Sequence, residues 1–456
     1  MGHHGDYHSH LDRTVTIRFG DALLASLAPG GGLWMPDAIP EFSGDDLARL
    51  GAMDFADCAA ELATHFTDDR FDAATLKAIC RDAYDFPVPM VTLDGEVLHP
   101  AMPPNADDFV LELFHGPTLA FKDFAARFMG RTASHLLTSS GKRRTILVAT
   151  SGDTGGAIGD AFRDQGGIEV FILYPKGGVS SVQERQLTTI GKPDGNVHAI
   201  RIEGTFDDCQ QLVKDAFADP ELVERFDLMS ANSINVGRVI PQSFYYFWTA
   251  LRARAAFPKR PVVFSIPSGN LGNLTGGLIA RAMGAPIARF VVANNVNDPM
   301  VGYLESGEYV PRNSQPTLSN AMDIGRPNNF PRILALFGDQ LDAVREACWG
   351  ASFSDEETAR HIRRVRRDTG YLMCPHTAVG HLGMQAFRDA HPALEATFVT
   401  VGTAHPAKFA DSLEDILREP IPTPPALAEA ERKTPRVQDM PPSLNALAAY
   451  VGCHVK

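Results

Sequence analysis

The chain has 456 residues, 44% hydrophobic and 21% charged, which are values of a globular protein with room for two or three domains. Its formal charge of -13 argues against a nucleic-acid partner, so an anionic substrate needs a local cationic pocket. No apolar run approaches a membrane span and the start lacks the apolar segment of a signal peptide, so we expect a soluble cytoplasmic protein. Six cysteines without CxxC pairs are typical of reduced thiols.

Residues 1–95 are predicted to form a mainly helical N-terminal domain. The His-rich residues 1–10 are interpreted as a mobile terminus or part of an expression tag. Amphipathic patterns predict a short helix over 19–27 and helices across 43–86. Three aspartates in the second segment are expected to cap helices: Asp45, Asp54 and Asp72. The Pro-rich residues 88–105 then connect this domain to the rest of the chain.

The stretch 111–130 contains the residue with the most specific chemistry. An apolar run at 109–114 has strand composition, stops at His-Gly-Pro-Thr and is followed by a helical pattern from near Leu119. Lys122 lies at that junction between two phenylalanines, where desolvation lowers its pKa and supplies the neutral amine that a Schiff base requires. The alternative is a lysine whose stem lies on the helix and whose head is in water. Two further stretches, described below, favour the cofactor interpretation.

From about residue 107 onward, short β-branched runs alternate with amphipathic segments. The predicted strands cover residues 145–149, 170–174, 197–202, 262–266, 288–293 and 398–401. The predicted helices cover residues 155–164, 209–218, 241–255, 274–283 and 355–368. Such alternation predicts an α/β fold with mostly parallel strands and helices on both faces, so the loops after strands are natural ligand sites. Residues 420–442 are expected to carry little structure before a last helix.

A Gly-rich loop at 265–273, Ser-Ile-Pro-Ser-Gly-Asn-Leu-Gly-Asn, connects a predicted strand to a predicted helix. Gly269 and Gly272 allow close backbone approach, and the helix N-terminus offers free N–H groups to an anion. The spacing is neither a Walker loop nor GxGxxG, so no nucleotide is implied. A phosphate cradle and a plain connecting turn both remain open for this loop.

The loop at 148–156 repeats the arrangement of strand, small polar turn and helix. Thr150, Ser151 and Thr154 bring hydroxyls next to helix-terminal N–H groups, which suits a carboxylate. Asp153 could simply cap the helix that follows.

A third polar stretch, residues 230–238, follows the short apolar run 226–229. It combines an arginine with amides and a hydroxyl, a set suited to a phosphate group: Asn232, Ser233, Asn235 and Arg238. An Asn-rich turn without a ligand is the alternative.

A fourth strand end, in residues 398–409, presents Thr403 before a helix expected from about Pro406. Cys374, His376 and His381 suggest zinc, but their spacing does not fit a closed site and no fourth ligand is apparent. We therefore predict no metal.

Six segments in a fixed order relate the chain to a known family: HGPTLAFKDF, ATSGDTGGA, SANSINVGR, PSGNLGN, LSNAMDIGRPNN and GTAHPAKF. With them the chain resembles the threonine synthases of the fold-type II pyridoxal-phosphate enzymes, in particular their long bacterial and fungal branch. The resemblance runs from Phe19 to Phe409, although Thr-Ile-Arg-Phe at 16–19 replaces the Ser-Thr-Arg-Gly opening of many relatives. It implies a tryptophan synthase β-like catalytic region over 96–456, with a smaller subdomain at roughly 124–250.

The resemblance also implies residue roles. Lys122 would form the Schiff base with pyridoxal 5'-phosphate, Thr403 would face the pyridine nitrogen, and Asp153 stands where related enzymes often carry an asparagine near the 3-oxygen. The cofactor phosphate would be held by Gly269, Asn270, Leu271, Gly272 and Asn273. The substrate carboxylate would be taken by Thr150, Ser151 and Thr154. The substrate phosphate would be taken by Asn232, Ser233 and Arg238.

The implied reaction converts O-phospho-L-homoserine and water to L-threonine and phosphate by γ-elimination and β-addition of water. One alternative is another pyridoxal-phosphate lyase of the same fold, such as a serine or threonine dehydratase, which has no substrate phosphate for Arg238 to bind. The other is a non-catalytic relative that binds cofactor or metabolite as a regulator, which an intact Lys122 disfavours. We expect a small-molecule substrate, no nucleic-acid or membrane partner, and a monomer or weak homodimer.

Overall fold

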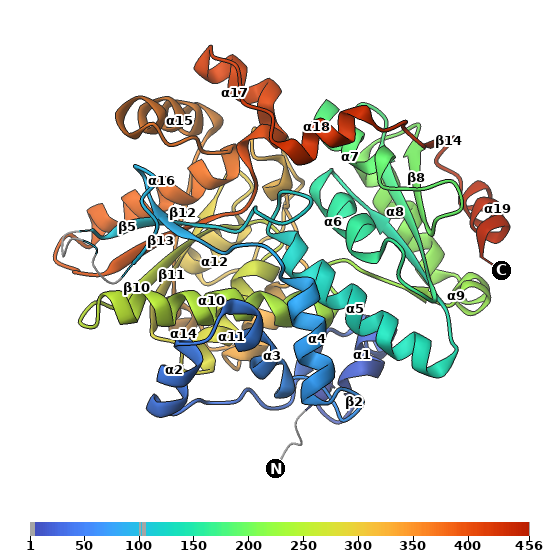
Figure 1. Cartoon of the computed structure of the whole chain (residues 1–456), viewed down its shortest axis with the longest axis horizontal. Coiled ribbons are helices and arrows are strands. Elements are labelled where there is room, and N and C mark those ends of the chain that lie inside the picture. The colour runs from blue at the N-terminus through green and yellow to red at the C-terminus, as the bar shows by residue number, and fades with distance from the viewer. Residues whose placement is uncertain (1–4, 100–101, 103–105, 456) are drawn as a thin grey trace.

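The computed structural model describes residues 5–99, 102 and 106–455 of the chain. Two mainly parallel sheets flanked by helices lie side by side, and the N-terminal segment packs below them in the view of Figure 1. Among the described residues no helix is both long and apolar enough to cross a membrane.

The N-terminal region combines a small antiparallel sheet with helices. Its sheet has the order β2-β1-β3, formed by β1 (Asp6–Ser9), β2 (Thr16–Arg18) and β3 (Trp34–Pro36). Its helices are α1 (Phe19–Ala25), η1 (Pro29–Gly31), α2 (Gly44–Gly51), α3 (Phe55–Thr64) and α4 (Ala73–Ala83).

The expectation of a mobile or tag-like start is wrong for the part that is described. Tyr7 is fully buried in β1 and donates its hydroxyl to the carbonyl of Phe66 at 2.9 Å. His8 is also buried in this strand, because β1 is the middle strand of the sheet. Residues 1–4 of the predicted segment lie outside the described residues.

Two of the three predicted helix caps are confirmed. Asp54 accepts the N–H of the third residue of α3, and Asp72 does the same for α4. Asp45 is not a cap, because Ser43 and Asp46 bond each other's backbone N–H groups in a reciprocal capping box. This box satisfies two donors at once, so α2 begins at Gly44 and Asp45 falls in its first turn.

The larger sheet has six strands in the order β12-β11-β10-β13-β5-β4, and only the β4–β5 pair is antiparallel. The strands are β4 (Met90–Thr92), β5 (Asp108–Glu112), β10 (Val262–Pro267), β11 (Ile287–Asn294), β12 (Cys348–Ser352) and β13 (Thr397–Gly402). The associated helices are α10 (Val236–Ala256), α11 (Gly272–Ala282), α12 (Pro299–Ser306), η2 (Asn320–Met322), α13 (Phe330–Leu336), α14 (Leu341–Ala347), α15 (Asp355–Thr369), α16 (Pro375–Ala390), η3 (Pro406–Phe409) and α17 (Ala410–Leu417).

The smaller sheet has five parallel strands in the order β14-β8-β7-β6-β9. They are β6 (Arg144–Ala149), β7 (Ile168–Pro175), β8 (Val197–Ile202), β9 (Leu228–Met229) and β14 (Gln438–Met440). The helices of this half are α5 (Lys122–Ser140), α6 (Asp153–Phe162), α7 (Ser181–Thr189), α8 (Phe206–Ala218), α9 (Pro220–Phe226), α18 (Pro425–Arg432) and α19 (Leu444–His454). All six strands predicted above fall within observed strands.

The C-terminal segment departs from the expectation. Residues 420–442 were expected to carry little structure, but they form α18 and the edge strand β14. β14 pairs with β8, and α19 buries Leu447 and Val451 against the apolar cluster behind this sheet. The chain therefore returns to the smaller sheet at its end, outside the 124–250 range, as the red segments of Figure 1 show. The division into domains stays a prediction.

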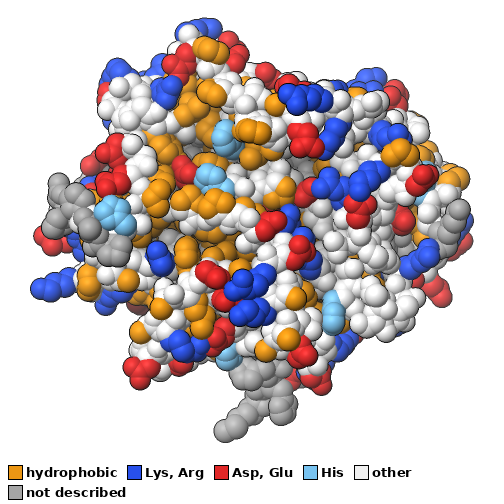
Figure 2. Space-filling model, viewed as in Figure 1, with side chains coloured by type: hydrophobic (Ala, Val, Ile, Leu, Met, Phe, Trp, Pro, Cys, Tyr) orange, Lys and Arg blue, Asp and Glu red, His pale blue; other side chains and the backbone are white. Residues whose placement is uncertain are grey.

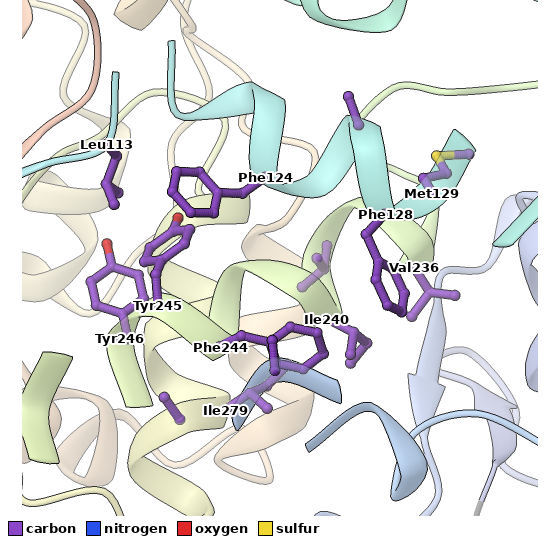
Figure 3. Packing of buried hydrophobic residues seen from close by; sticks show 14 of the residues in the cluster. Leu113, Phe124, Phe128, Met129, Val236, Ile240, Phe244, Tyr245, Tyr246 and Ile279 are labelled. Carbon is purple, nitrogen blue, oxygen red and sulfur yellow. The ribbon is translucent and has the colours of Figure 1, made fainter. Parts of the chain in front are cut away.

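Helices α5 and α10 form the central packing layer between the two halves. Figure 3 shows Phe124 and Phe128 of α5 directed at Tyr245 and Phe244 of α10, with ring centroids 5.2 Å and 5.8 Å apart. Aromatic pairs at this spacing add to the burial of apolar area and fix the orientation of the two helices. The N-terminus of α5, which carries Lys122, is thereby held at a defined position.

Candidate active site

Lys122 is the first residue of α5 and lies beside the end of β13. The turn before it requires Leu119 in the left-handed region, with φ 60°. The N–H of Phe121 then donates to the carbonyl of Thr403 at 2.8 Å. Since β5 and β13 are parallel neighbours, their carboxyl ends meet at one edge of the sheet. The structure therefore brings the predicted Lys122 and Thr403 together.

The environment of Lys122 disfavours its charged form. Burial lowers the pKa of Lys122 to about 8, and the positive charges of Lys408 and Arg238 act in the same direction. The Asp153 carboxylate opposes them. The Lys122 Nζ makes no hydrogen bond to any described residue. A substantial fraction of this amine is therefore neutral near pH 8.

Asp153 and Lys408 form a buried ion pair next to this lysine. Lys408 Nζ lies 2.8 Å from Asp153 Oδ1, and both side chains are almost completely buried. Gln183 donates to the same carboxylate oxygen at 3.0 Å, and Lys408 donates to the carbonyl of Thr118 at 2.8 Å. Burial raises the pKa of Asp153, but the ammonium groups of Lys408 and Lys122 outweigh it and hold that pKa well below its usual range.

The capping role left open for Asp153 is not observed. The N-cap of α6 is Gly152, and Asp153 makes no side-chain cap bond. Thr150 takes over part of that task, because its hydroxyl oxygen accepts the N–H groups of Gly152 and Gly155, each at 2.9 Å. The Thr150 oxygen thus shapes the loop, and its hydroxyl proton has no acceptor among the described residues, so it is available to a ligand.

The other two hydroxyls of this loop are differently placed. Ser151 and Thr154 are partly exposed, and their hydroxyls make no hydrogen bond to the described residues. Both are therefore free to bind a ligand at the start of α6.

The Gly-rich loop leads from β10 into α11 through a strained residue. Leu271 has φ 61° and is the N-cap of α11, but it supplies no side-chain cap. The first N–H groups of the helix are therefore open to an anion. Gly269 is required sterically, since a Cβ there would lie 2.9 Å from the Cα of Met322.

Asn273, in the first turn of α11, has a side-chain amide donor that is not used by any described residue. Its Oδ1 accepts hydrogen bonds from the hydroxyls of Tyr245, at 2.5 Å, and Tyr246, at 2.8 Å. Its Nδ2 is buried and has no hydrogen-bond partner among the described residues. Both tyrosines are seen beside Phe124 in Figure 3. A buried amide donor without a partner is costly, so it marks a place where a ligand acceptor fits.

The Asn-rich stretch lies against the Gly-rich loop. Asn270 Nδ2 donates to the Ser233 hydroxyl at 2.8 Å, which joins the two loops directly. Asn235 instead caps α10 and donates to the carbonyls of Leu23 and Ser230. The predicted start of this helix at 241 is therefore too late, and α10 begins at Val236.

Arg238 has unused donor capacity. It is buried, and its Nη1 donates to the carbonyl of Ala231 at 2.6 Å. Its Nε has no hydrogen-bond partner among the described residues. Burial lowers the pKa of Arg238 to about 10, so it still carries its charge at neutral pH. An anion is the natural partner for a buried guanidinium of this kind.

Arg332, which the sequence patterns did not single out, fixes these loops to the N-terminal region. Its guanidinium donates to the carbonyls of Ile234 at 2.6 Å, Ser233 at 3.1 Å and Trp34 at 3.3 Å, and to the Asn329 side chain. It is the largest fully buried side chain described.

The three residues considered for zinc have different partners. Cys374 accepts the N–H of Thr377 at 3.4 Å and caps α16, whereas His381 contacts His361 at 2.8 Å on another side. In the described part of the chain, no three His, Cys, Asp or Glu side chains are grouped so as to hold a metal ion.

His376, the third of them, belongs to the lysine site. Its Nε2 accepts the N–H of Ala321 at 3.1 Å, and its buried Nδ1 has no partner among the described residues. Burial lowers the pKa of His376 to about 4, and the charges that act on it are Asp153, Lys122 and Lys408. Lys408 and His376 are the site residues that the sequence patterns did not identify as such. Lys408 lies in the GTAHPAKF segment, but no sequence pattern indicated that it would pair with Asp153.

Family models and individual relatives assign the chain to the same protein family. Residues 108–443 match the family model for pyridoxal-phosphate dependent enzymes, and residues 6–84 match that for the threonine synthase N terminus. Threonine synthase of Escherichia coli K12 is 40% identical over 422 residues, which cover 92% of each chain.

Solved structures agree with this. A crystal structure of threonine synthase from Brucella melitensis with bound PLP superposes with a TM-score of 0.89 at 36% identity, covering 99% of each chain. The yeast threonine synthase structure gives a TM-score of 0.90 at 28% identity, covering 100% of this chain and 99% of the other.

Proposed function

The chain belongs to the threonine synthase family of pyridoxal-phosphate-dependent lyases, and we propose that its substrate is O-phospho-L-homoserine. Together with water, this substrate is converted to L-threonine and phosphate. The observation that carries the proposal is the unpaired Nε of the buried Arg238 beside a lysine with a lowered pKa. A guanidinium in that position suits a substrate phosphate.

The described residues fit pyridoxal 5'-phosphate. The cofactor offers an aldehyde, a phosphate, a phenolic oxygen and a ring nitrogen. Lys122 supplies an unpaired amine for the first, and the uncapped α11 N-terminus with the free Asn273 Nδ2 suits the second. We assign the phenolic side to Asp153 and the ring nitrogen to the Thr403 hydroxyl. The residues proposed to hold the phosphate are Gly269, Asn270, Leu271, Gly272 and Asn273.

When bound, the cofactor supplies an electron sink for negative charge at the substrate Cα. The protein supplies the proton transfers and the orientation. Lys122, with a pKa of about 8, is suited to take the Cα proton and to return it later. The Asp153–Lys408 pair fixes the charge next to this amine.

The two ends of the substrate need two anion sites. Thr150, Ser151 and Thr154, at the N-terminus of α6, are proposed to bind the carboxylate, and the Thr150 oxygen also holds their loop in shape. Arg238, with Asn232 and Ser233, is proposed to bind the phosphate that leaves from Cγ before water adds at Cβ. The carboxylate site consists of hydroxyl groups, and the phosphate site combines an amide, a hydroxyl and a guanidinium. All of these groups can donate hydrogen bonds to an anion and so orient it.

The alternative is a dehydratase acting on serine or threonine, and product analysis separates the two. The purified protein with pyridoxal 5'-phosphate is given O-phospho-L-homoserine, and phosphate and amino acids are quantified. We expect phosphate and L-threonine in equal amounts. Formation of a 2-oxo acid and ammonia from serine or threonine, without phosphate release from O-phospho-L-homoserine, would favour the dehydratase.

For compartment and partners we propose a cytoplasmic enzyme that is a monomer or weak homodimer and acts on a small molecule. All six cysteines are free and five of them are buried, which fits a reducing compartment. Figure 2 shows acidic and basic side chains interspersed on the face in view, with no broad basic surface there for a nucleic acid.

A further inference from the structure

Two lysines share one carboxylate at the site, but only one of them is bonded to it. Lys408 of η3 contacts Asp153 of α6 at 2.8 Å. Lys122 is also close enough to be affected by the Asp153 charge, yet its Nζ has no hydrogen bond to any described residue. The carboxylate is therefore committed to Lys408, and Lys122 is left without a counter-ion in contact.

We propose that Lys408 is a positioning residue that holds the Asp153 carboxylate and thereby keeps the Lys122 amine unpaired and ready to bind the cofactor. The inference rests on the role proposed above for Lys122. It adds a residue from a distant part of the chain to the site, and it explains why a fully buried second lysine lies next to the first.

Hydrogen bonds hold the Lys408 side chain in one position. Its ammonium has two hydrogen-bond partners from two other segments, the Asp153 carboxylate and the Thr118 carbonyl. Its own backbone carbonyl accepts the hydroxyl of Ser180 at 3.3 Å, and Gln183 holds the carboxylate from α7. A buried charge is tolerated only when it is paired and hydrogen-bonded in this way.

The charges around Lys122 determine what removing Lys408 would do. Besides Asp153 and Lys408, Arg238 of α10 acts on Lys122 with its charge and favours the neutral amine. His376 of α16 is nearby but is uncharged at neutral pH, because burial lowers its pKa to about 4.

A further acid, Asp123 on α5 itself, is buried and accepts both the N–H and the hydroxyl of Thr118. Burial raises the pKa of Asp123 to about 6. Because this carboxylate is already bonded to Thr118, it does not substitute for Asp153. Without the Lys408 charge, Asp153 would be left with Lys122 as its nearest lysine, and the pKa of Lys122 would rise.

The test measures the ionisation of Lys122 directly. Cofactor-free protein is labelled with trace acetic anhydride between pH 6 and 11, and acetylation of Lys122 is quantified by mass spectrometry. Lys408→Met should move the midpoint upward by about one pH unit or more, so that labelling at pH 8 falls roughly fivefold or more. Lys408→Arg, which keeps the charge, should stay near the wild-type midpoint.

A second substitution identifies the cause. In the double variant Lys408→Met with Asp153→Asn the carboxylate is gone, so the midpoint should return to the wild-type value or below it. An unchanged midpoint in Lys408→Met, or a rise that Asp153→Asn does not reverse, would overturn the proposal.

If Lys408→Met does not fold, Asp153→Asn alone decides: the midpoint should stay or fall, and a rise contradicts the proposal. The outcome is independent of the reaction catalysed, since the measurement uses no substrate. Failure of the proposed function would instead appear in the product analysis above.

Discussion

At the residue scale, the chemistry depends on which buried charges are paired. Lys122 is close to a carboxylate but unpaired, Lys408 is paired, and Arg238 has a free Nε. The sequence allowed Lys122 and Arg238 to be selected, because each lies in a short segment with its own pattern. It did not allow Lys408 to be selected, because its partner Asp153 belongs to a different half of the fold and only the folded chain brings them together.

The pKa of Lys122 gives a pH-dependent prediction. Because burial lowers this pKa to about 8, the neutral amine should increase as pH rises through 8 and level off above it. The rate at which cofactor-free protein combines with pyridoxal 5'-phosphate should follow the same curve between pH 6.5 and 9.5. A rate that is still rising toward the ordinary lysine pKa above pH 10 would show that Lys122 is not desolvated.

Arg238 gives a substrate-dependent prediction. Arg238→Leu removes the donor proposed for the substrate phosphate, and losing such a charge-assisted bond costs on the order of 2–5 kcal/mol, or roughly 30-fold to several thousand-fold in kcat/KM. Cofactor binding should survive, because its phosphate is assigned to the loop at α11. Slow turnover of serine or threonine should be nearly unchanged. Equal losses for phosphorylated and unphosphorylated substrates would make Arg238 a structural residue.

At the element scale, the ligand loops follow strands, as the alternating pattern predicted. The loops after β6, β10 and β13 all carry residues of the site. Helix starts were harder to predict, since local bonding sets them. Ser43 replaced Asp45 as a cap, and Asn235 starts α10 before the proline at 241. A proline tolerated inside a helix is a case in which tertiary packing outweighs local propensity.

The Gly-rich loop gives a prediction for two matched substitutions. A Cβ at Gly272 would lie 3.3 Å from Asn329 Nδ2, a tight contact with a side chain, whereas at Gly269 it would lie 2.9 Å from backbone. Gly272→Val should therefore keep the fold and weaken cofactor affinity by roughly tenfold or more, because it crowds the α11 N-terminus. Gly269→Val should lower the thermal midpoint as well. Unchanged cofactor affinity in Gly272→Val would count against the phosphate assignment.

At the whole-molecule scale, the N-terminal region and both halves of the α/β fold meet around the site. The alternation of strands and helices was enough to predict parallel sheets and helical layers. It did not reveal that β14 and α19 return to the smaller sheet, since a strand of three residues is too short to show an alternating pattern. Nor did it reveal that Asp6–Ser9, within the His-rich start, form a largely buried strand, because burial there depends on neighbouring strands in the sheet.

Arg332 tests how these parts depend on one another. It bonds carbonyls of the N-terminal region and of the Asn-rich loop while fully buried. Arg332→Met should leave several carbonyls without donors and destabilise the fold by on the order of 3 kcal/mol. Denaturant unfolding measures this. Exposed Arg312→Met serves as the control, and an equally small loss in both variants would show that Arg332 does not join the parts.

The identity of the cofactor-bearing lysine tests the central claim most directly. Borohydride reduction of the protein with pyridoxal 5'-phosphate makes the link between lysine and cofactor permanent, and peptide mapping then locates it. The account predicts one label per chain, on Lys122, even though Lys408 is also buried in the site. A label on Lys408 or another lysine, or no label at all, would contradict it.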